Sequence, residues 1–213
     1  MTARGAFITL EGVEGVGKST NAEFAAHCLR SLGRRVLVTR EPGGTALGEQ
    51  IREWILHGEH GRLSADVETL LMFAARSQHL ERVIRPALAS GRWVVCDRFT
   101  DATWAYQGGG RGADRALLEA LTRAVQGPTV PDLTLLLDAP FEVGAGRIRG
   151  RRPDHFERED RAFFTRVRDA YLALAREQPG RIKVLDASRP LEEVQRDIER
   201  ELLSFNERFG TDA

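Results

Sequence analysis

The chain has 213 residues, of which 42% are hydrophobic and 29% are charged, proportions typical of a globular domain and not of a disordered, collagen-like or coiled-coil protein. Its 31 basic and 31 acidic residues cancel, which disfavours nucleic acid as the main partner because polyanion binders carry a basic excess. At roughly 100–200 residues per domain, this length predicts a single domain over residues 1–213.

Short apolar runs along the chain predict β-strands. They are nearly continuous rather than alternating, which is typical of strands buried on both faces of a parallel sheet. Amphipathic helical patterns lie between them. This alternation predicts an α/β fold, a doubly wound parallel five-stranded sheet with helices on both faces. The predicted strands are Ala6–Leu10, Val36–Thr39, Trp93–Cys96, Leu133–Leu137 and Ile182–Leu185.

A phosphate-binding motif follows the first predicted strand and precedes an amphipathic helix. Residues 12–19 read GVEGVGKS and match G-x-x-x-x-G-K-[ST] in full. Glycines let successive N–H groups face phosphate oxygens, and the helix N-terminus adds its positive dipole end. Lys18 is expected to reach the β- and γ-phosphates of a nucleoside triphosphate, and the Ser19 hydroxyl to ligate Mg²⁺. The predicted phosphate-binding residues are Gly12, Val13, Glu14, Gly15, Val16, Gly17, Lys18, Ser19 and Thr20.

Two long helical stretches, Leu47–Leu56 and Asp66–Leu88, are predicted between the second and third strands, and Pro86 should kink or end the latter. Arg40 directly follows the second strand. Met72 and Arg76 share one helix face because they are four residues apart. In a nucleotide-binding fold these positions favour a ligand site, although each residue alone would be read as an ordinary surface or core side chain.

The third predicted strand ends in Asp97-Arg98. Motor and assembly ATPases usually carry Asp-Glu there, and the chain has no guanine-reading Asn/Thr-Lys-x-Asp motif. An arginine at the carboxyl end of a parallel strand faces the ligand crevice, where it suits a second phosphate better than the activation of water. Thr103, Tyr106 and Gln107 follow closely. We interpret the next segment, Gly108–Ala113, as a flexible loop before a helix cap at Asp114, since no strand leads into it.

Residues 147–154 read RIRGRRPD, which is too basic for a core, and predict a small arginine-rich lid over about residues 147–157. Cys28 and Cys96 lie in apolar stretches, so we expect buried thiols and no disulfide. We find no signal peptide, no apolar run that could span a bilayer and no zinc-type cluster. The chain therefore reads as cytoplasmic, with no membrane partner.

Several motifs together resemble the bacterial thymidylate kinases, P-loop nucleoside monophosphate kinases that transfer a phosphoryl group from ATP to dTMP. They span nearly the whole chain: ITLEGVEGVGKST (residues 8–20), TREPGGT (39–45), FAAR (73–76), CDRFTDATWAYQGGGRG (96–112) and PDLTLLLD (131–138). The resemblance implies ATP and dTMP as substrates, Mg²⁺ as cofactor and a homodimer formed by helix packing.

The resemblance also implies roles for individual residues. Glu14 would accept a hydrogen bond from the 3′-hydroxyl, Tyr106 would contact the sugar, and Asp97 would help Ser19 to hold Mg²⁺. The acceptor phosphate would be bound by Arg98, with Arg40 and Arg52 as weaker candidates. The thymine edge would be bound by Arg76, Thr103 and Gln107, and Met72 or Phe73 would lie against the ring.

Catalytic arginines of this family lie either in the phosphate loop or in the lid. The loop position here is Gly15, so the resemblance implies a lid arginine, Arg151 or Arg152, acting with Lys18 and Arg98, while Arg147 would lie over adenine. The lid also carries His155 where an arginine is common.

Two alternatives stay open. The chain could phosphorylate another nucleotide, or a nucleoside, for which Glu11 or Glu41 could accept the 5′-hydroxyl proton. It could also be a nucleotide-binding module without turnover, although such a module has no need of a second phosphate site.

Overall fold

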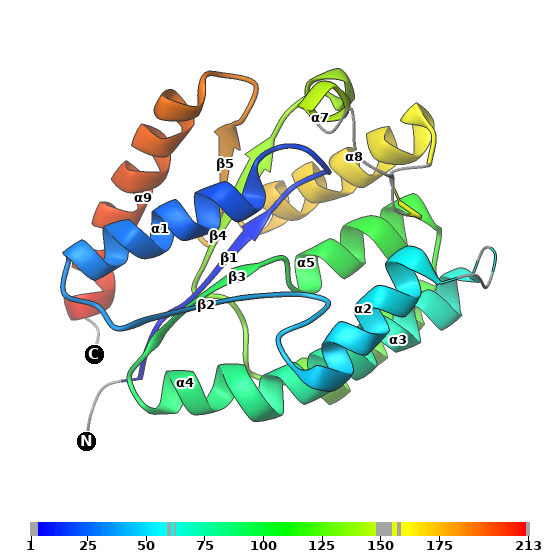
Figure 1. The fold of residues 1–213 in the computed structure, drawn as a ribbon, viewed down its shortest axis with the longest axis horizontal. Coiled ribbons are helices and arrows are strands. Elements are labelled where there is room, and N and C mark those ends of the chain that lie inside the picture. The colour runs from blue at the N-terminus through cyan, green and yellow to red at the C-terminus, as the bar shows by residue number, and fades with distance from the viewer. Residues whose placement is uncertain (1–3, 59–60, 62, 148–154, 157–158, 212–213) are drawn as a thin grey trace.

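A parallel sheet forms the centre of the computed structural model (Figure 1), which describes residues 4–58, 61, 63–147, 155–156 and 159–211. Within these residues the sheet has five strands in the order β2-β3-β1-β4-β5, and every neighbouring pair is parallel. The predicted fold class is thereby confirmed. The strands are β1 (Phe7–Glu11), β2 (Val36–Arg40), β3 (Trp93–Asp97), β4 (Leu133–Asp138) and β5 (Ile182–Asp186).

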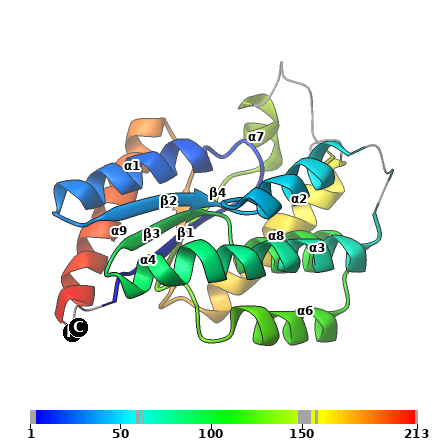
Figure 2. The same cartoon turned by 60° about the horizontal axis from the view of Figure 1, so that its bottom comes forward.

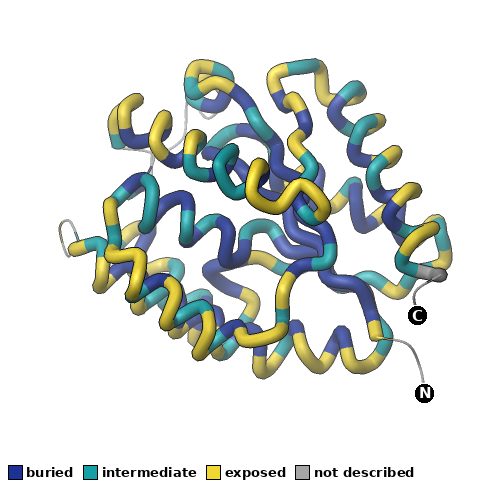
Figure 3. Tube along the Cα trace, turned by 180° about the vertical axis from the view of Figure 1, so that it is seen from behind, coloured by how far each residue is buried: buried dark blue, intermediate teal, exposed yellow. Residues whose placement is uncertain are grey.

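Burial differs between the middle and the edges of the sheet. β1, β3 and β4 are almost wholly buried, as continuous apolar runs predict, and they form the dark centre of Figure 3. The expectation of burial on both faces is wrong for β2, which is only half-buried, and for β5, in which Val184 is 48% exposed. Both are edge strands, where one side has no neighbouring strand to cover it.

Helices cover both faces of the sheet. Figure 2 shows α1 and α9 on one face and the α3–α4 segment on the other. Along β3, Trp93 packs edge-on against Phe205 of α9, whereas Val94 and Cys96 pack with Ile84 on the opposite face. The α-helices are α1 (Lys18–Ser31), α2 (Ala46–His57), α3 (Ala65–His79), α4 (Arg85–Ala89), α5 (Thr100–Thr103), α6 (Arg115–Leu121), α7 (Phe141–Arg147), α8 (Arg161–Glu177) and α9 (Leu191–Thr211).

The structure also contains three π-helical segments among the described residues: η1 (Leu80–Ile84), η2 (Trp104–Gly110) and η3 (Thr122–Gln126). η1 interrupts the helix predicted over Asp66–Leu88, and η2 includes part of the predicted glycine loop. η1 joins α3 to α4 just before Pro86, where the ring removes one helical N–H donor. The loop interpretation is wrong for Gly108–Gly110, which belong to η2. A Cβ on Gly110 would lie 2.5 Å from the ring of Phe163 in α8, so close packing, not flexibility, explains glycine there. The cap at Asp114 is confirmed, since its side chain accepts from the Ala116 N–H.

Register brings the carboxyl ends of neighbouring strands together. Leu10 of β1 lies beside Asp97 of β3, and Asp97 lies beside Arg40 of β2. Ligands in open α/β sheets bind outside these ends. Among the described residues, none of the helices combines the length and apolar character that crossing a bilayer requires.

Candidate active site

A cavity of about 480 Å³ opens at the carboxyl ends of β1, β2 and β3. It brings together most of the residues singled out in the sequence. The lining includes Glu14, Gly15, Gly17, Lys18, Ser19, Thr20, Arg40, Arg52, Met72, Arg76, Asp97, Arg98, Thr103, Tyr106, Gln107 and Arg147. Sequence reasoning did not single out Pro42, Leu56, Phe99, Ala102 and Phe156, apolar residues that complete the wall.

The phosphate loop needs its glycines for two separate reasons. Gly12, Gly15 and Gly17 have φ values of 138°, 74° and 89°, which other residues rarely adopt. A Cβ on Gly12 would also lie 2.3 Å from a backbone oxygen of β4, and one on Gly15 would lie 2.2 Å from the Gly144 oxygen. Val13 and Val16 are buried in the core and anchor the loop instead of lining the cavity.

Lys18 is the cation of this loop. It is 7% exposed, its Nζ donates to the Val13 carbonyl oxygen at 2.7 Å, and it lies 3.8 Å from a carboxylate oxygen of Glu14. Burial, aided by the nearby charge of Arg98, lowers the pKa of Lys18 to about 8. A bound phosphate would raise this pKa again, because a nearby negative charge favours the protonated ammonium.

Ser19 and Asp97 provide oxygen atoms beside the loop. The Ser19 hydroxyl donates to Asp97 Oδ2 at 2.7 Å, and both residues line the cavity. Hydroxyl and carboxylate oxygens are the ligand types that Mg²⁺ takes beside substrate phosphates. The pair therefore fits the predicted metal. No group of three or more His, Cys, Asp or Glu side chains within the described ranges could hold a metal ion by itself.

Arg98 organises the centre of the site. Its guanidinium donates to the Gly12 carbonyl oxygen at 2.8 Å, to Glu14 at 2.7 Å and to the hydroxyls of Tyr106 and Tyr171 at 3.1 and 3.2 Å. Although burial would raise it, the charges of Arg98 and Lys18 lower the pKa of Glu14 to about 2. Arg98 has φ 69°, a strained conformation for a residue with a side chain, and such strain is common at functional sites.

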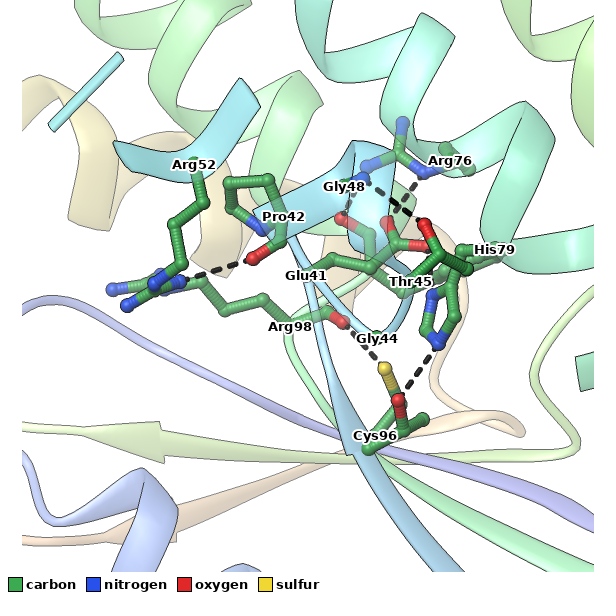
Figure 4. Close-up of polar contacts among 12 residues, drawn as sticks. Glu41, Pro42, Gly44, Thr45, Gly48, Arg52, Arg76, His79, Cys96 and Arg98 are labelled. Carbon is green, nitrogen blue, oxygen red and sulfur yellow. Dashed lines mark hydrogen bonds and ion pairs between the residues drawn. The ribbon is translucent and has the colours of Figure 1, made fainter. Parts of the chain in front are cut away.

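Two further arginines gather near Arg98. Arg52 donates to the Pro42 carbonyl oxygen at 3.1 Å and reaches toward Arg98 in Figure 4. Arg40, at the rim, pairs with Glu49 at 2.9 Å. Burial and the charges of Arg40 and Arg98 lower the pKa of Arg52. Cations that repel one another in this way favour an anionic ligand between them.

Arg76 belongs to a buried polar network that sequence reasoning missed (Figure 4). Its Nε donates to Glu41 at 2.7 Å, and its Nη2 donates to the Thr103 hydroxyl at 2.9 Å. Glu41 also contacts His79 at 2.9 Å, and His79 contacts Thr39 at 2.7 Å. Arg76 Nη1 is buried without a hydrogen-bond partner among the described residues, and buried donors rarely stay unpaired, so it suits a ligand acceptor.

Met72 and Phe73 are separated by the structure. Met72 lines the cavity, whereas Phe73 is 1% exposed and lies in the core beneath Arg76, its ring centre 4.8 Å from the guanidinium carbon. Of these two residues, only Met72 is therefore placed where it could contact a base in the cavity.

The two carboxylates named as candidate bases, Glu11 and Glu41, are already bound to other groups of the protein. Glu11 is fully buried and accepts hydrogen bonds from the Phe99 N–H and the Tyr171 hydroxyl, and burial raises its pKa to about 8. Glu41 is held between Arg76 and His79. Neither carboxylate is available to accept the proton of a 5′-hydroxyl, which argues against a nucleoside as the acceptor.

Arg147, at the end of α7, lines the cavity and donates to the Ala187 carbonyl oxygen at 3.0 Å. Arg151 and Arg152 lie outside the described residues. Beyond them, the His155 ring contacts the Gly58 carbonyl oxygen at 2.9 Å, and Phe156 packs edge-on against Tyr106. The C-terminal end of the predicted lid therefore contacts the end of α2 and the cavity wall.

Comparison with known proteins gives a consistent result. A family model described as Thymidylate kinase matches residues 10–198. The chain is 57% identical over 212 residues to a thymidylate kinase of Bordetella petrii, an alignment that covers 97% of this chain and 99% of the relative. It is 56% identical over 197 residues to one of Alcanivorax borkumensis, covering 92% and 95%.

A solved structure shares the fold. The crystal structure of thymidylate kinase from Ehrlichia chaffeensis superposes with a TM-score of 0.76 at 32% sequence identity and covers 94% of this chain and 99% of its own.

Proposed function

The chain belongs to the thymidylate kinase family, and from this premise we propose which residues carry each part of its reaction. The reaction is phosphoryl transfer from ATP to dTMP, which gives ADP and dTDP. The observation that carries the assignment of roles is a single cavity that holds the phosphate loop with Lys18, an arginine cluster around Arg98, and the buried guanidinium of Arg76.

The phosphate loop would bind ATP. Residues 12–20 provide backbone N–H groups, and Lys18 provides the charge that follows the transferred phosphoryl group. Ser19 and Asp97 would hold Mg²⁺, which when bound adds positive charge at the β- and γ-phosphates. Arg147 would lie over adenine, a role supported by its position on the cavity wall.

The arginine cluster would bind the phosphate of dTMP. A phosphomonoester with a second pKa of about 6 is largely dianionic at neutral pH, so the acceptor oxygen needs no general base. The difficulty is the repulsion between two anions. Arg98, supported by Arg52 and Arg40, would offset this repulsion and align the acceptor with the donor.

The remaining polar residues would bind the nucleoside. Arg76, Thr103 and Gln107 would hydrogen-bond the thymine edge, and Met72 would pack its thioether on the ring. Glu14 would accept from the 3′-hydroxyl, and Tyr106, tied to Glu14 at 3.2 Å, would disfavour a 2′-hydroxyl.

The lid arginines Arg151 and Arg152 would neutralise charge on the transferred group, since Gly15 leaves the phosphate loop without an arginine. We expect Arg151→Ala or Arg152→Ala to lower kcat and kcat/KM together while dTMP affinity is nearly unchanged. Arg147→Ala should instead raise the KM for ATP. Single-turnover rates and dTMP binding measure these effects.

A matched control is Arg115→Ala, which removes an arginine that is 79% exposed and pairs with Glu119 on α6. It should leave the chemical step unchanged. If neither Arg151→Ala nor Arg152→Ala slows that step by more than about tenfold, a loss of roughly 1.4 kcal/mol, the lid mechanism is wrong.

We also propose that residues 1–213 form one kinase domain that is cytoplasmic and assembles as a homodimer by helix packing. Leu47 of α2 and Val67 and Leu70 of α3 are 42–50% exposed. A second copy of the chain would cover such apolar side chains.

A further inference from the structure

Glu68 is a buried carboxylate to which the proposed mechanism gives no role. It lies on α3, two turns before Arg76, and is 4% exposed. Its Oε1 accepts a hydrogen bond from Nε2 of Gln107 at 2.6 Å, and Gln107 is 1% exposed on η2. Two helical segments are thus joined by one short hydrogen bond beside the cavity wall.

The chemistry of this contact fixes the direction of the Gln107 amide. An ionised carboxylate only accepts hydrogen bonds, so the NH₂ end of the amide must face it. Burial raises the pKa of Glu68, while the bond from Gln107 and the charge of Arg111, whose Nε lies 3.4 Å from Oε2, favour the ionised form. With its nitrogen held by Glu68, Gln107 has its carbonyl oxygen left for a ligand.

This direction matters for the choice of base. A thymine edge offers a donor at N3–H and an acceptor at O4, whereas a cytosine edge offers an acceptor at N3 and a donor at the 4-amino group. Arg76 can only donate, and Gln107, with its NH₂ end turned to Glu68, offers the base its carbonyl oxygen, an acceptor. The pair therefore complements thymine and opposes cytosine at both positions.

We propose that Glu68 is a specificity-determining positioning residue, which locks the Gln107 amide in the orientation that accepts thymine N3–H and rejects cytosine. The inference rests on the proposed function, because Gln107 is there a proposed contact to the base. Without the lock, the amide can turn and present its NH₂ group to cytosine N3, so the enzyme loses one of its two hydrogen-bonding contacts that oppose cytosine and keeps only that of Arg76.

The test compares dTMP, dUMP and dCMP as ligands and as acceptors for Glu68→Leu, which removes the acceptor. We expect the ratio of dTMP to dCMP, in both dissociation constant and kcat/KM, to fall at least about tenfold, or about 1.4 kcal/mol. The ratio of dTMP to dUMP should not change, because these bases share the edge that Gln107 contacts. A merely structural role would weaken all three nucleotides alike.

Further variants isolate the effect. Glu159→Gln removes the other carboxylate that pairs with Arg111 but keeps the Glu68–Gln107 bond, so it should leave both ratios unchanged. Glu68→Gln keeps an oxygen that can accept but no longer forces one orientation. It should show a smaller fall than Glu68→Leu, and it decides the question alone if the leucine variant does not fold.

A dTMP to dCMP ratio within about twofold of wild type in the folded Glu68 variants would overturn the proposal. Gln107→Leu shows which part has failed. If this variant also keeps the wild-type ratio, the proposed base contact is wrong and the proposal fails with it. If it loses discrimination while the Glu68 variants keep it, only the positioning role of Glu68 is wrong.

Discussion

Replacing Lys18 with alanine should lower kcat by about 10²–10³-fold, because a preorganised charge at the transferred phosphoryl group is worth roughly 3–4 kcal/mol. The ammonium is buried in the phosphate loop and within 3.8 Å of Glu14, so bulk solvent cannot replace it. Burial lowers the pKa of Lys18, which means that the folded protein disfavours its charged form. Removing this cation should therefore not unfold the protein.

The sequence offers a matched control, since Lys183 is its only other lysine. Lys183 lies on the edge strand β5 and donates to the Pro179 carbonyl oxygen at an exposed site. Lys183→Ala should keep wild-type turnover. Steady-state kinetics with ATP and dTMP, alongside thermal unfolding, compare the two variants. Near-normal turnover in folded Lys18→Ala would show that this loop is not the site of phosphoryl transfer.

Replacing Arg98 with alanine should lower kcat/KM for dTMP by about 10³-fold, or roughly 4 kcal/mol. The substitution removes the charge at the acceptor phosphate. It also leaves Glu14, a partly buried carboxylate, without its closest partner, at 2.7 Å, which destabilises the folded state. We therefore expect a lower melting temperature in addition to the kinetic loss.

Arg98→Lys separates these two effects, since it keeps one charge and the same backbone strain but loses the multiple hydrogen bonds of the guanidinium. It should recover part of the stability and little of the activity. Arg40→Ala is the control at the rim, where the side chain is 53% exposed, and should change kcat/KM by less than about tenfold. An equally small effect in folded Arg98→Ala would contradict its assignment to the acceptor phosphate.

Local patterns were sufficient to predict the phosphate loop and the central strands. The loop is a contiguous motif whose glycines adopt positive φ, as Gly12 and Gly15 illustrate. The atoms that would crowd a side chain at these two positions come from Leu137 and Gly144, far along the chain, so that second requirement is not visible in the motif. Runs such as Ala6–Leu10 are apolar because they are covered on both sides. Whether a run becomes an edge strand depends on strand order, and this is why the exposure of Val184 was not foreseen.

Contacts between distant segments could not be read from local patterns. Glu41 follows β2 and His79 ends α3, and only the fold brings them to 2.9 Å from each other. The same holds for Glu68 and Gln107, which are 39 residues apart in the sequence and form a hydrogen bond only in the folded chain. One signal was present in the sequence: Glu68, Arg76 and His79 are titratable residues in a helix that also carries the apolar run Leu70–Ala75. The sequence could not show which residues they contact, because their partners lie on other elements.

The most direct test of the account is an ADP-release assay with ATP and a panel of acceptors: dTMP, dUMP, UMP, CMP, AMP and thymidine. The proposed site predicts that dTMP is the best acceptor and that dUMP, which lacks the 5-methyl group and buries less apolar surface, is weaker. UMP should be poorer still because Tyr106 disfavours its 2′-hydroxyl, and thymidine should be inactive because it has no phosphate for the arginine cluster. Faster phosphorylation of CMP or AMP than of dTMP, or ADP release that does not depend on any acceptor, would contradict it.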